Sequence, residues 1–431
     1  MEPKEQPLIY LDNNATTQVD PAVFEAMMPW LRDEYGNPSS VYSLGRRAAA
    51  ALDVAREQVA ALIGATPAEV VFTSCGSESI NSAILSAASL DPDKTHIITT
   101  AVEHSATIKL CEHLARRGYE ITWLPVDNLG RLDLGRLEKA IRPDTALVTL
   151  LWANNETGVL FPVEEIARLT NEKKVPLHVD AVQAVGKLPI NVAELGAQFV
   201  SLSGHKLHCP KGVGALYVNR RMRFTPWLRG SQENSRRGGT QNVASIVGLG
   251  KAAELAARHI REEATTVRAL RDHFEQTILA TVPGTDVNGD RENRLPNTTN
   301  LAFESIESEG ALMLLDERGI CCSAGSACTS GSVHPSHVLS AMGCSADRAR
   351  SSLRFSFGRF NTCEQIDIAC TVIPEVIEKL RRLSPTPGPV VMAAEGGGRF
   401  RTPARTIGPP QVVRQTGATT RPVAADSAMA S

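Results

Sequence analysis

The stretch from residue 70 to residue 206 alternates short apolar runs with longer segments in which apolar side chains recur at helical spacing. Short apolar runs bounded by small residues are typical of buried strands, and the longer segments are typical of amphipathic helices. We expect strands at 70–73, 96–100, 120–124 and 146–153, two more strands ending at Asp180 and Ser203, and helices at 80–88, 105–117, 133–141 and 163–171. This alternation predicts an α/β fold with a mostly parallel sheet covered on both faces.

The expected strands end in polar side chains. In an open parallel sheet, ligands bind beyond the carboxyl ends of the strands. The residues at or just after these ends include Ser77, His104, Asn155, Asp180, Ser203, His205 and Lys206. Because these ends meet at one edge of the sheet, the sequence predicts a polar ligand site there.

Lys206 follows an apolar run in a turn of small and polar residues. A lysine that loses its charge by desolvation can condense with an aldehyde as a Schiff base, and pyridoxal phosphate (PLP) is the commonest such aldehyde. The alternative is a solvated surface lysine. Asp180 ends the preceding strand and can hold the pyridine nitrogen of PLP protonated, although a helix N-cap is the alternative. Gln183, one turn later, can hydrogen-bond the ring hydroxyl.

A phosphate site is expected between the strand at 70–73 and the following helix. The connecting residues 74–79 are small or polar, and such a strand-to-helix turn aims backbone N–H groups at an anion. An ordinary capped helix is the alternative, because the turn lacks a fuller glycine-rich fingerprint.

Cys328 stands at the centre of residues 323–332, a run of small residues with no apolar period. We expect a mobile loop that exposes this cysteine, which makes its thiol a candidate nucleophile. An incidental loop cysteine is the alternative. The other cysteines singled out are interpreted as small buried side chains.

The chain is long enough for two or three domains. A long helical segment begins at Asn242 and runs to Leu279, and further strands (300–303, 352–357) and helices (309–317, 366–383) predict a smaller α/β domain. We expect residues 1–17 to be an N-terminal segment joining the small domain, 18–261 a large domain, and 262–384 the small C-terminal domain. Residues 385–431 are rich in Pro, Gly, Ala, Thr and Arg and are expected to be disordered.

Charge and cysteine usage exclude several classes of function. The formal net charge is −2 and there is no long basic stripe, so we expect no nucleic-acid partner. We expect no membrane association either, because no apolar stretch reaches spanning length. Nine cysteines scattered without metal-finger spacing, and a start without a secretory apolar region, predict a reducing cytoplasmic location.

Several longer motifs together resemble one known family. These are residues 10–17 (YLDNNATT), 72–79 (FTSCGSES), 102–104 (VEH), 152–158 (WANNETG), 178–187 (HVDAVQAVGK), 203–208 (SGHKLH) and 325–332 (GSACTSGS). They resemble the PLP-dependent cysteine desulfurases of the class-V aminotransferase family, and more narrowly the nitrogen-fixation type, NifS. The resemblance runs from about residue 8 to residue 385, which is nearly all of the expected folded part.

The resemblance implies a PLP fold-type I homodimer that converts L-cysteine to L-alanine and leaves a persulfide on Cys328. The sulfur would serve iron–sulfur cluster assembly through a scaffold protein as acceptor, for nitrogenase maturation. The family's metal-binding role would fall on Cys328 as a transient iron–sulfur ligand.

The same resemblance assigns roles to individual residues. Lys206 would carry the cofactor, Asp180 would pair with its ring nitrogen, and His104 would stack on the ring and move protons. The ring hydroxyl would be contacted by Gln183 and Asn155, the phosphate by Gly76, Ser77, Ser203, His205 and the partner subunit's Thr240, and the substrate carboxylate by Arg354, with Asn13 or Asn37 nearby.

This sequence departs from the family pattern at a few positions. Ser77 stands where threonine is usual, which keeps the hydroxyl, and Tyr42 stands where histidine is common. A selenocysteine lyase or a small aminotransferase of the same fold is the neighbouring alternative, but an aminotransferase needs no nucleophile in the 323–332 loop. A catalytically silent partner protein is a third reading, and it would be expected to have lost Lys206 or Cys328.

Overall fold

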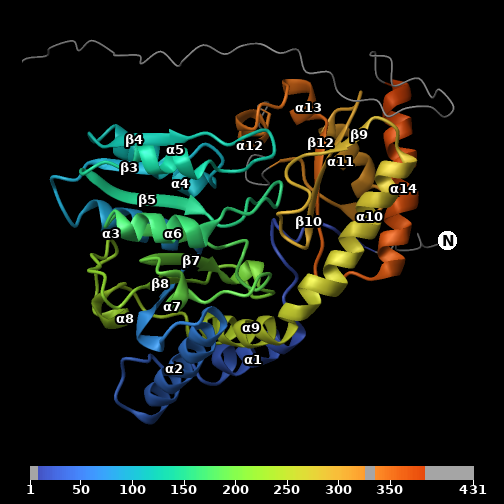
Figure 1. Ribbon diagram of the computed structural model, residues 1–431. Coiled ribbons are helices and arrows are strands. Elements are labelled where there is room, and N and C mark those ends of the chain that lie inside the picture. Colours follow the sequence, from blue (N-terminus) through green and yellow to red (C-terminus); the bar gives the residue numbers. More distant parts are fainter. Residues whose placement is uncertain (1–7, 326–334, 384–431) are drawn as a thin grey trace, which may run out of the picture. The chain divides into compact units, whose positions relative to one another are not determined.

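A computed structural model describes residues 8–325 and 335–383. Its main feature is a seven-stranded sheet, in which the strands lie in the order β2, β8, β7, β6, β5, β3, β4 (Figure 1). The strands are β2 (Val70–Thr73), β3 (His96–Thr100), β4 (Glu120–Leu124), β5 (Thr145–Leu151), β6 (Leu177–Asp180), β7 (Phe199–Ser203) and β8 (Gly214–Val218). Only β8 runs against its neighbours in this sheet. The expected mostly parallel α/β sheet is therefore confirmed.

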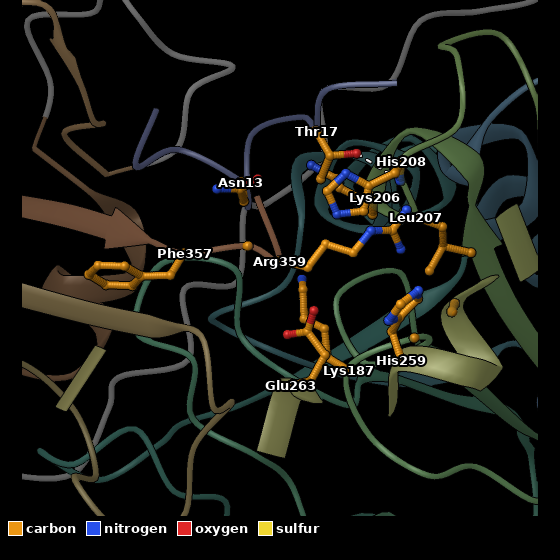
Figure 2. A pocket seen from close by; sticks show the side chains of 13 residues that line it. Asn13, Thr17, Lys187, Lys206, Leu207, His208, His259, Glu263, Phe357 and Arg359 are labelled. Carbon is orange, nitrogen blue, oxygen red and sulfur yellow. Dashed lines mark hydrogen bonds between the residues drawn. The ribbon is translucent and has the colours of Figure 1, made fainter. Parts of the chain in front are cut away.

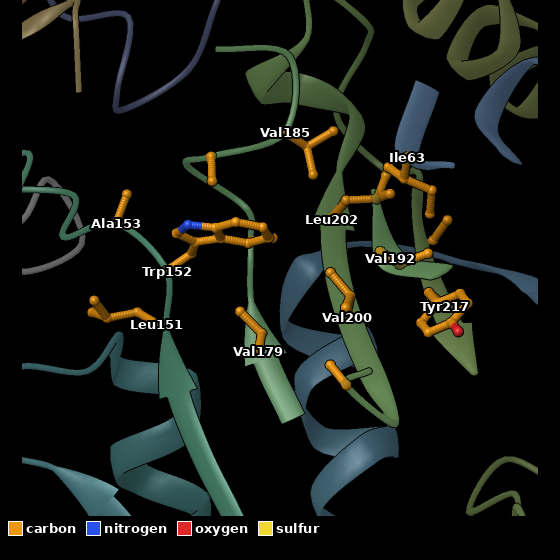
Figure 3. Packing of buried hydrophobic residues seen from close by; sticks show 14 of the residues in the cluster. Ile63, Leu151, Trp152, Ala153, Val179, Val185, Val192, Val200, Leu202 and Tyr217 are labelled. Atoms are coloured by element: carbon orange, nitrogen blue, oxygen red, sulfur yellow. The ribbon is translucent and has the colours of Figure 1, made fainter. Parts of the chain in front are cut away.

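Apolar side chains on neighbouring strand residues point to opposite faces of the sheet. On one face Val71, Ile97, Leu147, Phe199 and Leu216 pack with helices α3 (Gly76–Ala88) and α4 (Ser105–Ala115). On the other face the strands pack with α2 (Ser43–Ile63), α5 (Leu134–Ala140), α6 (Val163–Glu172), α7 (Val192–Leu195) and α9 (Val243–Glu262). Figure 3 shows part of this second layer, where Val179, Val200 and Leu202 lie beside Trp152 and Tyr217. Both faces are therefore buried, as a parallel sheet requires.

A second apolar cluster forms around a three-stranded antiparallel sheet of β9 (Thr285–Val287), β10 (Thr298–Phe303) and β12 (Ser352–Ser356). Helices α10 (Arg268–Thr281), α11 (Ser308–Asp316) and α14 (Cys363–Leu383) pack against it. The N-terminal strand β1 (Ile9–Tyr10) pairs with β11 (Ile320–Cys321) and adds Ile9 and Leu11 to the same cluster. The domain limits expected above stay a prediction, because the described residues pack as one unit.

One nearly continuous helical segment connects the helix layer that contains α9 with the apolar cluster around the three-stranded sheet. Helix α9 passes through a π-helical turn at Glu263–Val267 into α10, and the expected helix at 242–279 is therefore interrupted. A π-turn adds a residue to the helical repeat and often marks a functional position.

Some elements were not expected from the sequence. They are β1, β8, β9 and β11, the short helices α7, α8 (Gln232–Ser235), α12 (His337–Ala341) and α13 (Ala346–Arg350), and the short 3₁₀ turns at Pro67–Glu69 and Gly204–Lys206. The helix expected at 80–88 already begins at Gly76, and near the N-terminus the side chain of Asp20 caps α1 (Pro21–Arg32).

The described residues also limit what the chain can do. Each of their helices is too short or too polar to cross a membrane. Within 8–325 and 335–383, no three His, Cys, Asp or Glu side chains are grouped so that they could hold a metal ion. The transient metal role predicted for Cys328 lies outside these residues, and the cytoplasmic location stays a prediction.

Candidate active site

A cavity of about 680 Å³ opens at the carboxyl ends of the parallel strands. Ten of the residues singled out in the sequence line it: Gly76, Ser77, His104, Asn155, Asp180, Gln183, Ser203, His205, Lys206 and Arg354. They come from strand ends and turns spread over nearly three hundred positions of the chain. The fold therefore brings together residues that the sequence placed at one edge only because the carboxyl ends of parallel strands meet there.

The turn that carries Lys206 is braced by the N-terminal segment. The Nζ of Lys206 donates to the carbonyl oxygens of Asn14 and Ala15, the latter at 2.7 Å. The carbonyl of His205 accepts from both the backbone N–H and the hydroxyl of Thr17, each at 3.0 Å. These bonds hold the lysine amine at the cavity rather than in bulk solvent, which excludes the solvated surface lysine considered above.

Asp180 is buried at the end of β6 and lines the cavity near His104. Its Oδ1 accepts from the backbone N–H of Val182 at 3.0 Å. Burial raises the pKa of the Asp180 carboxyl, and the nearby His104 and Lys206 lower it in part. A buried carboxylate in this setting is stabilised by a cation placed against it, and a protonated pyridine nitrogen is such a cation.

His104 caps the N-terminus of α4. Its Nδ1 accepts from the backbone N–H of Ala106 at 3.1 Å, so in the neutral ring the proton sits on Nε2. The cap fixes the imidazole at the cavity wall and leaves Nε2 as the atom that can exchange a proton with a bound group.

An anion cradle lies where α3 begins. Cys75, Gly76 and Ser77 line the cavity at the helix N-terminus, where backbone N–H groups lack helical partners. A Cβ at Gly76 would lie 2.9 Å from Val182 Cγ2, so this position is packed for glycine. The Ser203 hydroxyl is buried and has no hydrogen-bond partner among the described residues. A buried hydroxyl normally has a partner, and its absence here fits a phosphate oxygen as the missing one.

His205 completes the cradle. Its Nδ1 lies 3.2 Å from the Thr16 hydroxyl. Burial, followed by the nearby charge of Lys206, lowers the pKa of His205 to about 4, so the ring is neutral near pH 7. The residues present therefore fit PLP: an amine, a carboxylate for the ring nitrogen, and donors for the phosphate.

Arg354 reaches the cavity from β12 and is almost completely buried. Its Nη2 pairs with Asp12 Oδ1 at 2.6 Å, its Nη1 donates to the carbonyl of Asn155 at 3.0 Å, and its Nε has no partner among the described residues. The sequence reasoning missed Asp12, although it lies inside the motif at 10–17. The guanidinium is thus held in place by an internal carboxylate while keeping donors for another one.

Three residues predicted at the site do not line this cavity. Asn13 donates to the carbonyl of Ser356 at 2.9 Å and packs away from it. Asn37 is exposed and accepts from the backbone N–H of Ser39, and Thr240 is exposed as well. Their roles stay predictions, and Cys328 lies outside the described residues.

Asn14, the chain neighbour of Asn13, was missed in the sequence. It lines the cavity, and its side-chain Nδ2 donates to Thr298 Oγ1 at 2.9 Å and to the carbonyl of Asn155 at 3.2 Å. Lys187 and His337 were missed too: Lys187 is buried behind the cavity, and His337 lines it. The only signal for Asn14 and Lys187 was their position inside the two motifs at 10–17 and 178–187.

The family model for aminotransferase class-V matches residues 9–368. The chain therefore belongs to the class-V aminotransferase family, and the enzymes of this family depend on PLP.

Within that family the similarity is to cysteine desulfurases. The chain is 54% identical over 379 residues to a cysteine desulfurase of Nostoc sp., covering 88% of this chain and 95% of the relative. It is 51% identical to the cysteine desulfurase NifS of Azotobacter vinelandii, covering 88% of this chain and 94% of the relative. A solved NifS-like protein superimposes with a TM-score of 0.82 at 36% identity, covering 87% of this chain and all of that one. The chain is thus a member of the PLP-dependent cysteine desulfurases.

Proposed function

We propose that this protein removes the sulfur atom of L-cysteine and keeps it as a persulfide on Cys328. In the net reaction the Cβ–S bond of L-cysteine is cleaved, a sulfur–sulfur bond forms on the Cys328 thiol, and L-alanine leaves with a hydrogen on its Cβ. The step is balanced without an external oxidant or reductant, because one thiol becomes a persulfide while the substrate carbon is reduced.

A single observation carries this proposal. Lys206, Asp180 and Ser203, whose hydroxyl has no partner in the part of the chain that the structure describes, line one cavity, and the N-terminus of α3 lies at the same cavity. An amine, a buried carboxylate and a phosphate cradle are the three protein groups that PLP requires. Bound there, PLP supplies an electron sink that makes the substrate's Cα–H and Cβ–S bonds breakable.

The chain's own residues then have distinct tasks. Lys206 holds the cofactor through its Nζ and exchanges a proton at the substrate Cα. His104 donates or accepts a proton at Nε2, since its Nδ1 is occupied by the Ala106 N–H. Gln183 and Asn155 would contact the ring hydroxyl, and the phosphate would be held by Gly76, Ser77, Ser203 and His205, together with the partner subunit's Thr240 in a homodimer.

Arg354 is proposed to bind the substrate carboxylate. Guanidinium groups recognise carboxylates through two parallel hydrogen bonds, and Arg354 Nε is a buried donor without a partner among the described residues. Asp12 fixes the plane of this group from the other side. The predicted help from Asn13 or Asn37 is part of the same proposal.

Both ends of the segment that carries Cys328 lie beside the cavity. Before the segment, Ser323 pairs with Arg354 through two backbone hydrogen bonds of 2.7 and 3.2 Å. After it, the Ser336 hydroxyl donates to buried Glu156, and the next residue, His337, lines the cavity. The two anchors support the assignment of Cys328 as the residue that receives the sulfur.

The proposed physiological role is sulfur supply for iron–sulfur cluster assembly, with a scaffold protein as acceptor and nitrogenase maturation as the destination. The 51% identity to NifS of Azotobacter vinelandii supports this destination. The transient iron–sulfur role of Cys328 belongs to the same proposal.

Intact-protein mass spectrometry after addition of L-cysteine tests the reaction. We expect a mass gain of one sulfur atom, mapped to Cys328, and L-alanine as product without any added 2-oxo acid. Alanine that forms only when a 2-oxo acid is present would identify an aminotransferase instead. Lys206→Ala is expected to abolish the absorbance of bound PLP, and an unchanged spectrum would refute the cofactor assignment.

A further inference from the structure

Lys187 is a buried lysine that the proposed reaction does not use. It closes the motif at 178–187, and the residue is 6% exposed. Gly186, immediately before it, has a φ of 78°, and a Cβ there would lie 2.4 Å from Leu207 Cδ2. This turn sends the next side chain inward, behind the wall of the large cavity.

The ammonium of Lys187 touches two side-chain amides. It donates to Gln183 Oε1 at 2.8 Å and to Asn14 Oδ1 at 3.3 Å. An ammonium group has three donors and no acceptor, so the amide atom facing it must be oxygen. Lys187 therefore holds the oxygen of each amide from one side. The Asn14 carbonyl holds Gln183 Nε2 from the other side, and the Asn14 amide is held as well by Asn297, Thr298 and the Asn155 carbonyl.

The fixed orientation decides what Gln183 presents to the cavity. With Oε1 held by Lys187, its Nε2 is the remaining polar atom, and it donates to the Asn14 carbonyl at 3.0 Å. The same carbonyl accepts from Lys206 Nζ. Gln183 lines the cavity, so a bound group that reaches its amide meets the Nε2 donor and not the Oε1 acceptor.

A second, much smaller cavity lies behind Lys187 and has a volume of about 20 Å³. Figure 2 shows Lys187 and Glu263 side by side at this cavity, with Arg359 and His259 also pointing toward it. Glu263 begins the π-turn, and its Oε2 has no partner among the described residues. A polar cavity of this size has room for about one water molecule, which can bridge the two charges.

The surrounding charges explain how a lysine is held there. Burial lowers the pKa of Lys187 to about 8, while Glu263 acts to raise it and Arg354 to lower it. Arg359 is itself paired with Asp20. Glu263, at the start of the π-turn, is thus the acidic group that acts on Lys187, and burial raises the pKa of its own carboxyl to about 7 while Lys187 lowers it.

We propose that Lys187 is a positioning residue that fixes Gln183 as a hydrogen-bond donor to the ring oxygen of the cofactor, with Glu263 as its counter-charge. The proposal rests on the proposed function, which places PLP in the large cavity. It predicts that Lys187 acts through Gln183 and not by direct contact with the substrate.

The test is a pH titration of the absorbance of bound PLP in the purified holoprotein. Lys187→Met removes the bond that holds Gln183 Oε1 and also removes a nearby positive charge, and both changes favour the protonated form of the bound cofactor. We expect the pH midpoint to rise by about one unit. Gln183→Leu, which removes the donor itself, is expected to shift the midpoint in the same direction, whereas Lys187→Arg keeps a donor-only cation and is expected to restore the wild-type midpoint.

A double-mutant cycle decides the route of action. If Lys187 works through Gln183, Lys187→Met shifts the midpoint less in the Gln183→Leu protein than in the wild type. Equal shifts in both backgrounds would mean that only charge at a distance matters and would overturn the proposal, as would an unchanged midpoint in Lys187→Met.

Two further measurements separate this outcome from other failures. If Lys187→Met does not fold, Lys187→Gln keeps a polar group in the cavity, and its midpoint is expected to rise while an unchanged one would contradict the proposal. A wild-type protein that shows no absorbance from bound PLP would refute the proposed function itself, before any variant is compared.

Discussion

Replacing Ser203 with alanine should have opposite effects on the empty protein and on the cofactor complex. Ser203 is 2% exposed, and its hydroxyl has no hydrogen-bond partner among the described residues. A buried hydroxyl without a partner costs about 1–3 kcal/mol. Ser203→Ala should therefore leave the free energy of unfolding of the apoprotein unchanged or raise it by about 1 kcal/mol.

In the complex the same hydroxyl is expected to bond a phosphate oxygen. A hydrogen bond to a charged group contributes about 1.5–3 kcal/mol, which corresponds to a loss of roughly 10- to 100-fold in PLP affinity. Urea unfolding of the apoprotein and a PLP titration followed by absorbance measure the two quantities. An apoprotein that loses stability while its PLP affinity stays at the wild-type value would refute the reasoning.

Ser201 provides the matched control. It lies two residues earlier on β7, is fully buried and does not line the cavity, and its hydroxyl bonds His178 Nε2 at 2.8 Å. Ser201→Ala should destabilise the apoprotein by about 1 kcal/mol and leave PLP affinity unchanged. Ser203→Ala is thus expected to lower PLP affinity and Ser201→Ala to lower the stability of the apoprotein, although both variants lose the same hydroxyl group.

Four more outcomes are expected. Asp180→Asn should keep PLP bound but lower kcat by about 100-fold or more, because the ring nitrogen loses its charged partner. Because burial raises the pKa of Asp180, the wild-type apoprotein should also lose stability as the pH rises above the pKa that this carboxyl has in the unfolded chain. Urea unfolding should not find this loss in the variant. Arg354→Lys should raise KM for L-cysteine by about tenfold or more with the PLP spectrum retained, since an ammonium cannot make the paired bonds of a guanidinium. Cys328→Ala should keep the spectrum of bound PLP and lose the persulfide mass gain, and full turnover in this variant would show that sulfur leaves by another route. His205 has a pKa lowered to about 4, so the unfolded chain takes up a proton there between about pH 6.5 and 4 while the folded apoprotein does not. The stability of the apoprotein should therefore fall as the pH is lowered through that window. Thermal unfolding at each pH should find a smaller fall in His205→Gln.

The sequence located the strands of the large sheet well where each was a separate apolar run. The strands at 96–100 and 120–124 have the bounds that periodicity predicted. Strand β8 was missed because it follows the Lys206 turn after a short loop and runs antiparallel to β7. The alternation of strands and helices predicts only parallel strands that are separated by a helix. The π-turn at Glu263 is invisible in a continuous helical pattern for a similar reason, since one extra residue barely disturbs the apolar period.

The site was predictable where the chemistry is local and not where the partners are distant. Lys206 and Asp180 each follow their own strand, so order along the chain was enough to bring them together. The ion pair of Asp12 with Arg354 joins residues 342 positions apart, and periodicity gives no information on such a contact. Asn14 and Lys187 hold amides whose orientation depends on the folded geometry, so their part could be found only once donors and acceptors were placed.

The bracing of the lysine turn by residues 14–17 has a consequence for the order of events during synthesis. These residues leave the ribosome first, yet the arginine held by their neighbour Asp12 belongs to β12 and is made more than three hundred residues later. A nascent chain that ends before β11 already contains every strand of the large sheet, while β1 still lacks its partner strand. The arginine proposed to bind the substrate carboxylate therefore reaches its final place only after the first and last strands of the folded polypeptide have met.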